Sequence, residues 1–360
     1  LEFRRVLFRS LMAVIKPDNY KRFLKKYSDL KSLDLLIADL NGVLRGKRIQ
    51  TSALEKVFQE GLLLPASVFA GDITGATVEE TGLGIAQGDS DRVCRPIPGT
   101  LSKSPWYKKS MAQLLMTMHE ADGNPFFADP RQVLTRIIGQ FQESGFTAVV
   151  AVELEFYLLD IRRDRQKYPQ PPISPVTGKR DKNTQVYSVD DLDDYGEFLD
   201  QVAKGAVSQG IPADTALAEY APGQFEINLK HEADPLSACD NAILLKRLIK
   251  GVAREMGMIA TFMAKPYAQQ AGSGTHIHIS ILNKDQKNIF SDPLNEIGSI
   301  ILHHAIGGLS KTMKESMAIY CPNANSYRRF QPDLYVPMAP TWGIANRTVA
   351  ISTETRRVGK

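Results

Sequence analysis

Residues 149–159 read Val-Val-Ala-Val-Glu-Leu-Glu-Phe-Tyr-Leu-Leu, an apolar run that holds two glutamates two positions apart. Its length and composition predict a buried β-strand. Because strand side chains alternate between the two faces of a sheet, Glu153 and Glu155 should lie on one face. A carboxylate among apolar neighbours is costly to desolvate unless a cation compensates its charge. A divalent metal ion would do this, and other segments of the chain offer further ligands.

Composition excludes several classes of protein. The chain has 360 residues, 43% hydrophobic and 23% charged, which is typical of a globular protein with two domains. The net charge of +4 is small and the charges are interspersed, so no nucleic acid partner is expected. No membrane partner is expected either, since no apolar stretch approaches the ~20 residues of a membrane helix. Cys94, Cys239 and Cys321 are widely spaced and predict reduced thiols in a cytoplasm.

The two ends of the chain are predicted to be foreign to the natural protein. Residues 1–11 precede Met12, which is a natural start. Residues 352–360 contain Arg-Arg-Val, a tripeptide that also occurs at residues 4–6. We interpret residues 1–11 and 352–360 as cloning or assembly tails, the alternative being disordered natural tails.

Local patterns predict an α+β fold. Asn41-Gly42 between two apolar runs predicts a hairpin over residues 33–49. Helices are expected at residues 16–30, 130–145, 188–210, 234–257 and 297–320, and further strands at 113–118, 261–264 and 275–282. Strands alternate with helices, but hairpin signals also occur. We therefore expect an antiparallel sheet flanked by helices rather than a parallel one.

A second acidic pair is formed by Glu219 and Glu226, which flank Pro222-Gly223. Proline followed by glycine favours a tight turn, so the two carboxylates can converge from adjacent strand ends. Taken alone, the simpler interpretation is a pair of surface glutamates beside a hairpin.

Two histidines occur at strand spacing after a glycine-rich segment, Gly272-Ser273-Gly274. His276, His278 and Ser280 should then share one face of a strand, while the glycines let the backbone approach a ligand closely. Two histidines so placed can reach a metal ion or a phosphate, although a single strand histidine is more often structural.

The candidate ligands are mostly carboxylate oxygens, and no thiolate joins them. Such hard ligands favour Mg²⁺ or Mn²⁺ over Zn²⁺. Two such ions that bridge phosphate oxygens can drive phosphoryl transfer. Arg328, Arg329 and Arg347 are candidates to hold the transferred group, although any single one is more simply read as a surface arginine.

Five motifs in a fixed order resemble those of the glutamine synthetase superfamily. They are Glu-x-Glu at 153–155, Glu-x-Ala-Pro-Gly-Gln-x-Glu at 219–226, Gly-Ser-Gly-x-His-x-His-x-Ser at 272–280, Asn-Ser-Tyr-x-Arg at 325–329 and Asn-Arg-Thr at 346–348. The resemblance covers residues 33–351. It implies a β-grasp domain over residues 12–110 and a catalytic domain over residues 111–351. It also implies a homo-oligomer of stacked rings with active sites shared between subunits.

The resemblance also implies roles for single residues. ATP and two or more Mg²⁺ or Mn²⁺ ions would be bound, one ion by Glu155, Glu219 and Glu226 and another by Glu153 and His276. Substrate contacts are implied for Gly272, His276 and Arg329, nucleotide contacts for His278, Ser280 and Arg347, and catalytic roles for Arg329 on the substrate carboxylate and Arg347 on the transferred phosphate. Glu153 is a candidate base for the amine.

Two departures from the family pattern concern the amine. Ala70 stands where ammonia-using members carry an aspartate, and Tyr335 stands where they carry a flap glutamate. The substitutions predict a larger primary amine, with Ala70 and Tyr335 beside it. Segments 45–49, 64–67, 91–94 and 128–131 look most like the γ-glutamylputrescine synthetase branch.

The resemblance therefore implies an ATP-dependent ligase that joins the γ-carboxylate of glutamate to a primary amine, putrescine above all, through a γ-glutamyl phosphate. Two alternatives stay open: glutamine synthesis from ammonia, and a non-catalytic family member or inactive fragment. Ser352 stands where the family continues with an arginine and a later Arg-x-Glu segment. This implies a catalytic domain incomplete at its C-terminus.

Overall fold

The computed structural model describes residues 18–332 and 335–353. The predicted tail at 1–11 lies outside these residues, as do residues 354–360 of the other tail, while residues 352 and 353 lie in strand β13 (Ile351–Thr353). The tail and truncation predictions therefore stay predictions. Among the helices of the described part of the chain, none is both long enough and apolar enough to cross a membrane.

The chain divides into two compact units between Leu134 and Thr135. The division falls later than the predicted boundary after residue 110. Strand β6 (Met111–His119) accounts for the difference, because it pairs in parallel with β1 (Ser32–Ala38) and so extends the first sheet. The second unit begins only within α4 (Pro130–Glu143), the helix that follows β6.

The first unit is built on a mixed sheet with the order β2-β1-β6-β4-β3. The predicted hairpin at Asn41-Gly42 is confirmed, since β1 and β2 pair antiparallel and Gly42 has the positive φ of 66° that such a turn requires. The remaining strands are β2 (Leu44–Gln50), β3 (Leu62–Pro65), β4 (Asp91–Pro96) and β5 (Ser102–Lys103). The helices are α2 (Asp18–Lys26), α3 (Leu54–Glu60) and the 3-10 turns at Thr51–Ala53, Ala66–Phe69, Glu79–Thr81 and Ile85–Gln87.

The second unit is organised around β7 (Thr147–Asp160), the predicted glutamate strand. Strands β11 (Thr275–Leu282), β9 (Gln224–Leu229) and β10 (Met258–Thr261) all pair with β7 antiparallel, and β8 (Ala213–Ala218) pairs antiparallel with β9. The predicted antiparallel sheet is thus confirmed. Beyond β7, no other described strand pairs with β11, whose Ile277 and Ile279 are exposed.

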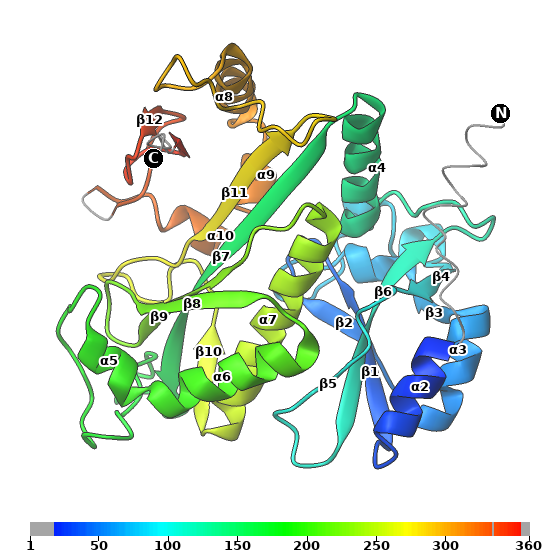
Figure 1. Ribbon diagram of the computed structural model, residues 1–360. Helices are drawn as coiled ribbons and strands as arrows, with labels where there is room; N and C mark the ends of the chain where they lie inside the picture. The colour runs from blue at the N-terminus through cyan, green and yellow to red at the C-terminus, as the bar shows by residue number, and fades with distance from the viewer. Residues whose placement is uncertain (1–17, 333–334, 354–360) are drawn as a thin grey trace. The chain divides into compact units, whose positions relative to one another are not determined.

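Helices cover one face of this second sheet (Figure 1). The long helix α7 (Pro235–Glu255) contacts β7 and β10, and α6 (Gly196–Gln209) contacts α7 and β8. Smaller elements complete the unit: α5 (Val189–Asp194), α8 (Ile300–Thr312), α9 (Met317–Tyr320), α10 (Ala324–Tyr327) and β12 (Trp342–Ile344), which pairs with β13.

Three predicted elements differ from the structure. The helix expected over residues 188–210 is divided at Tyr195 into α5 and α6. The strand expected at 261–264 lies earlier, as β10, because α7 is followed by Gly257 with a φ of 73° and the chain turns straight into the strand. The helix expected over 297–320 is broken into α8 and α9. Side-chain hydroxyls of Thr312 and Ser316 donate to carbonyls four residues earlier, a pattern that bends helices.

Candidate functional site

The face of the sheet that carries the acidic residues is fixed by the packing of its other face. Phe156 of β7 is fully buried, and its ring centroid lies 6.2 Å from that of Phe198 in α6. Since neighbouring residues on a strand point to opposite faces, burying Phe156 under the helices turns Glu153 and Glu155 to the other side. The apolar pattern therefore decides where the carboxylates lie.

Strand register then brings ligands from three strands together. Glu155 lies directly opposite Glu226 of β9, and Glu153 lies directly opposite His276 of β11. Directly opposed residues on antiparallel strands have their side chains side by side. Four potential ligands, separated by more than a hundred residues in the chain, therefore share one face.

The closest grouping consists of Glu153, Glu226 and His276, which we call the ligand cluster. One ligand atom from each lies within 4.8 Å of the other two. His276 Nδ1 is 3.0 Å from Glu153 Oε2 and 3.9 Å from Glu226 Oε2. The His276 side chain is 58% exposed while that of Glu226 is 8% exposed, so the cluster opens to solvent at the histidine.

Glu155 and Glu219 lie beside this cluster. His276 Nδ1 is 3.9 Å from Glu155 Oε1. Glu219 follows β8, and its backbone N–H donates to the Gln224 carbonyl at 2.8 Å across a turn in which Gly223 has a φ of 73°. The predicted Pro-Gly turn thus carries Glu219 towards the same face.

Burial and crowding of like charges shift the protonation of these groups. Burial, together with the charge of Glu155, raises the pKa of Glu219 to about 7, a shift that Arg347 opposes. Burial, with the charges of Glu153, Glu155 and Glu219, raises the pKa of Glu226 to about 7. Hydrogen bonds from His276 and His278 lower the pKa of Glu153 to about 2, and the bond to Glu153 raises that of His276.

These shifts fit a cation site. Carboxylates so close together cannot all ionise near neutral pH without a compensating positive charge. Their oxygens, with one imidazole nitrogen, form a donor set that suits Mg²⁺ or Mn²⁺. The residues present therefore fit the divalent ions that the family implies.

Binding of Mn²⁺ is expected to release protons. Glu219 and Glu226, with pKa values raised to about 7, are largely protonated at pH 6 and ionised at pH 8 in the metal-free protein. Ligation requires the ionised form, so we expect roughly one proton or more released per ion at pH 6 and far fewer at pH 8. Apparent affinity should rise over the same interval. Calorimetry in buffers of different ionisation enthalpy measures the release, and a pH-independent affinity would contradict the prediction.

A glycine-rich segment lies against the cluster and against Arg329. The Gly274 N–H donates to Glu155 Oε2 at 2.8 Å. A Cβ atom on Gly272 would lie 2.7 Å from the Ala264 carbonyl oxygen and 2.9 Å from Arg329 Nε, so a side chain there would force neighbouring atoms apart. Arg329 Nε is buried and has no hydrogen-bond partner among the described residues. A guanidinium with one buried, unused donor is suited to bind a carboxylate ligand.

Asn325 and Gln224 hold this arrangement by hydrogen bonds to the backbone, and neither is predicted as a site residue from the sequence. The Asn325 side chain accepts from the Lys265 N–H at 2.8 Å and donates to the Lys265 carbonyl at 2.9 Å. Gln224 Nε2 donates to the Gly272 carbonyl at 3.1 Å. Both residues stand in motifs quoted above. Their side-chain amides are neutral and bond to backbone groups from distant segments, so no charge pattern in the sequence marks them as functional.

The candidate nucleotide contacts lie near the cluster along β11. His278 Nε2 is 3.0 Å from Glu153 Oε1, and Ser280 follows on the same face two residues later. Arg347 comes from the segment between β12 and β13, where its Nη1 donates to the Tyr187 hydroxyl at 2.8 Å. Its positive charge lowers the pKa of Glu219, so the two side chains lie near each other.

The two residues predicted beside the amine fall in different compact units. Tyr335 is 67% exposed, and its ring centroid lies 6.2 Å from that of Tyr220, the residue after Glu219. Ala70 is buried within the first unit. The amine-binding role of both residues stays a prediction.

Comparisons with known proteins agree with this geometry. The family described as "Glutamine synthetase, catalytic domain" matches residues 127–358. γ-Glutamylputrescine synthetase PuuA of Escherichia coli K12 is 50% identical over 331 residues, which cover 92% of this chain and 70% of that protein. A glutamate–isopropylamine ligase of a Pseudomonas species is 32% identical over 342 residues, 91% of this chain and 71% of that protein.

A solved structure gives the same result at the level of the fold. The ligand-free form of GmaS superposes with a TM-score of 0.76 at 25% identity, covering 92% of this chain and 72% of that one. The profile match spans more than half of the chain, and the E. coli relative is well above 30% identical over most of its length. The chain therefore belongs to the glutamine synthetase family.

Proposed function

We propose that this protein is an ATP-dependent ligase that joins the γ-carboxylate of glutamate to a primary amine, with putrescine as the acceptor. The observation that carries the proposal is the 50% identity to a γ-glutamylputrescine synthetase. The ligand cluster supports it, because two carboxylates and an imidazole converge as a nucleotide-bound divalent ion requires.

In this proposal Glu153, Glu226 and His276, with Glu155 and Glu219 beside them, hold the divalent ions. Bound Mg²⁺ or Mn²⁺ ions neutralise the phosphate charges of ATP. His278 and Ser280 contact the nucleotide, and Arg347 contacts the transferred phosphate. The unused donor of Arg329, beside Gly272, supports its role in binding the α-carboxylate of glutamate.

The proposed reaction has two steps. A γ-carboxylate oxygen of glutamate attacks the γ-phosphorus of ATP, which forms γ-glutamyl phosphate and releases ADP. The amine nitrogen then attacks the acyl carbon, phosphate leaves, and the amine loses one proton. An alkyl amine is protonated at neutral pH and must lose a proton before it can attack. Glu153 is the predicted base, but a carboxylate whose pKa is lowered to about 2 is a weak proton acceptor, so we assign Glu153 to metal binding alone.

We extend the proposal to the first unit, to the oligomeric state and to the cellular compartment. We propose that the first unit is a β-grasp domain, which the parallel pairing of β1 with β6 beside the β1–β2 hairpin supports. We also propose a cytoplasmic homo-oligomer with sites shared between subunits. The three cysteines form no disulfide bond among the described residues, which is compatible with a reducing compartment.

The acceptor is tested by measuring ADP release with ATP, Mg²⁺ and glutamate while the amine is varied. Putrescine is expected to give a kcat/KM at least about tenfold above those of ammonium and isopropylamine, because a longer amine buries more apolar surface. A reaction without amine is the control. Equal or higher efficiency with ammonium would overturn the acceptor assignment, and no ADP with any amine would overturn the ligase.

A further inference from the structure

The irregular segment that leads into β11, residues 264–274, has its backbone held by side chains, and we call it the Lys265 loop. Three consecutive carbonyls accept hydrogen bonds: that of Gln270 from Lys265 Nζ at 2.5 Å, that of Ala271 from the Tyr157 hydroxyl at 2.6 Å, and that of Gly272 from Gln224 Nε2 at 3.1 Å. The Ser273 N–H donates to the Ala264 carbonyl at 2.9 Å and closes the loop at its base. Such bonds fix a loop without regular structure, so that it can position a ligand.

Lys265 also joins this loop to the segment that carries Arg329. Its backbone N–H donates to Asn325 Oδ1 at 2.8 Å, and its carbonyl accepts from Asn325 Nδ2 at 2.9 Å. At the other end of the loop Gly272 lies against both Ala264 and Arg329, since a Cβ added to it would lie 2.7 Å from the first and 2.8 Å from the second. The backbone and the side chain of Lys265 therefore act on one place, the contact between Gly272 and Arg329.

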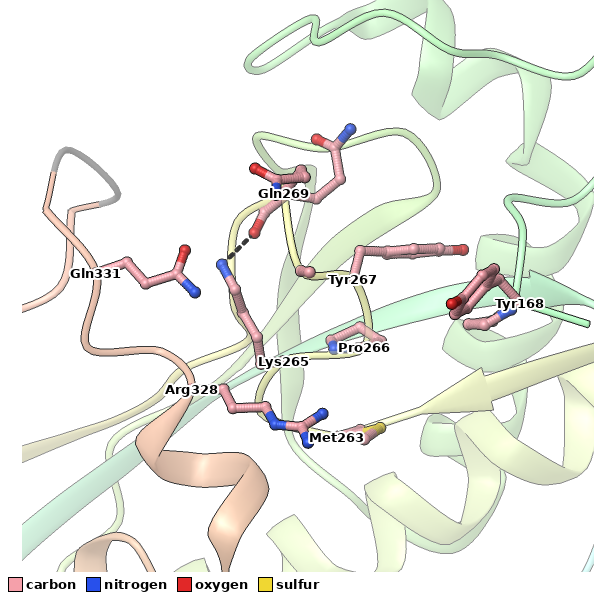
Figure 2. A pocket seen from close by; sticks show the side chains of 11 residues that line it. Tyr168, Met263, Lys265, Pro266, Tyr267, Gln269, Arg328 and Gln331 are labelled. Carbon is pink, nitrogen blue, oxygen red and sulfur yellow. Dashed lines mark hydrogen bonds between the residues drawn. The ribbon is translucent and has the colours of Figure 1, made fainter. Parts of the chain in front are cut away.

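The ammonium group of Lys265 is buried as well as bonded. The residue is 3% exposed, and Figure 2 shows its side chain directed at the Gln270 carbonyl, while Arg328 points away towards Met263. Burial and the positive charge of Arg329 lower the pKa of Lys265, so these two cations lie near each other. A neutral donor could hold the same carbonyl without the cost of burying a charge. The charge of Lys265 is therefore expected to have a function of its own.

An anion bound at Arg329 would account for this charge. Arg329 Nε is a buried donor without a hydrogen-bond partner within the described chain, and it is the proposed contact for the α-carboxylate of glutamate. Two neighbouring cations favour a carboxylate over a neutral ligand, and their attraction is stronger away from bulk water. Arg329 would bond to the carboxylate, while Lys265, held by the Gln270 carbonyl, would act on it through its charge alone.

We propose that Lys265 is a positioning residue for glutamate. Its ammonium group fixes the Lys265 loop, and with it Gly272 against Arg329, and it places a second positive charge near that guanidinium. Lys265 does not touch the substrate. The inference rests on the proposed binding of glutamate at Arg329, but not on phosphate transfer or on the identity of the amine.

The test is calorimetric titration of the full chain with L-glutamate in the presence of Mn²⁺, which requires no catalysis. Lys265→Met keeps an unbranched side chain and removes the ammonium group. We expect it to weaken glutamate binding by about tenfold or more, the scale of a hydrogen bond to a charged group, while Mn²⁺ affinity stays unchanged. In ADP-release assays KM for glutamate should rise by the same factor, with kcat changed by less than about threefold.

Two further variants separate the charge from the packing. Lys265→Arg keeps a positive charge and a donor, and the cavity of about 460 Å³ that Lys265 lines gives the larger group room, so this variant should recover most of the lost affinity. Tyr157→Phe removes only the hydroxyl that holds the Ala271 carbonyl. It tests the loop even if Lys265→Met does not fold, and it should weaken glutamate binding by about three- to tenfold.

Lys204→Met, at an exposed position of α6, is the matched control and should bind glutamate as the parent does. The proposal is overturned if the parent does not bind glutamate, or if Lys265→Met or Tyr157→Phe binds it as tightly as the parent. It is also overturned if Lys265→Arg loses as much affinity as Lys265→Met, or if Mn²⁺ binding falls together with glutamate binding, since either result would indicate packing alone. A parent that binds glutamate but releases no ADP would overturn the ligase and leave this inference in place.

Discussion

Replacing Glu226 with glutamine is expected to weaken Mn²⁺ binding by about a hundredfold or more, since loss of a group that merely supports a ligand already costs 10–100-fold. Glu226 supplies one of the three ligand atoms that lie within 4.8 Å of one another. Its side chain is also the most buried of the three, so a water molecule cannot easily replace it as a ligand. Titration calorimetry with Mn²⁺ measures the loss.

The same substitution should stabilise the metal-free protein. The pKa of Glu226 is raised from its ordinary value of 4.5 to about 7, so the folded state loses stability as the pH rises from about 4.5 to 7, and the penalty is complete above 7. Glutamine removes that penalty, and we expect a gain of roughly 1–2 kcal/mol at pH 8 that shrinks towards pH 5. Thermal unfolding at both pH values measures it.

Mn²⁺ should raise the unfolding temperature of the parent and not of the variant. Glu255→Gln, at an exposed position near the end of α7, is the matched control and should change neither quantity. Unaltered Mn²⁺ affinity in the Glu226 variant would remove this residue from the proposed metal site.

Adding a single methyl group at Gly272 is expected to lower kcat/KM for glutamate by about a hundredfold, the scale of loss for an ångström-sized misplacement of a binding group. The new Cβ would lie 2.7 Å from the Ala264 carbonyl oxygen and 2.8 Å from Arg329 Cγ. The Ala264 carbonyl belongs to the backbone and cannot easily move away. The Arg329 side chain must therefore shift. Steady-state kinetics with glutamate varied measure the effect.

This variant separates substrate binding from metal binding. Gly272 contributes no metal ligand, so Gly272→Ala should retain Mn²⁺ binding while it loses glutamate. Gly139→Ala in α4 is the matched control, because nothing lies within 4 Å of its added Cβ. An unchanged KM for glutamate in the Gly272 variant would show that this segment does not position Arg329 for the substrate.

Local pattern predicted the parts of the site that depend on single strands. Alternation within residues 149–159 put Glu153 and Glu155 on one face, and alternation within residues 275–282 did the same for His276 and His278; both strands are found where they were expected. Such periodicity follows from the geometry of one strand and needs no knowledge of its partners.

Contacts between distant segments were beyond such patterns. The alignment of Glu155 with Glu226 depends on which strand pairs with which, and in what register. The two hydrogen bonds between Asn325 and the backbone of Lys265 join residues 60 positions apart. A single sequence shows which residues are present, but the tertiary packing that makes them neighbours cannot be predicted from local patterns. The resemblance to a known family indicated which motifs lie together, because members of that family carry the same five motifs.

The edge position of β11 has a consequence for how the protein responds to chelators. The three ligand atoms of the cluster come from β7, β9 and β11, and β11 is joined through β7 alone within the described residues. An ion bound to these three side chains would link β11 and β9 to β7 through its ligands. Removal of the ion by a chelator would first let β11 open locally, at a temperature well below that at which the whole domain unfolds. Slower amide exchange along residues 275–282 would then report metal occupancy without any catalytic assay.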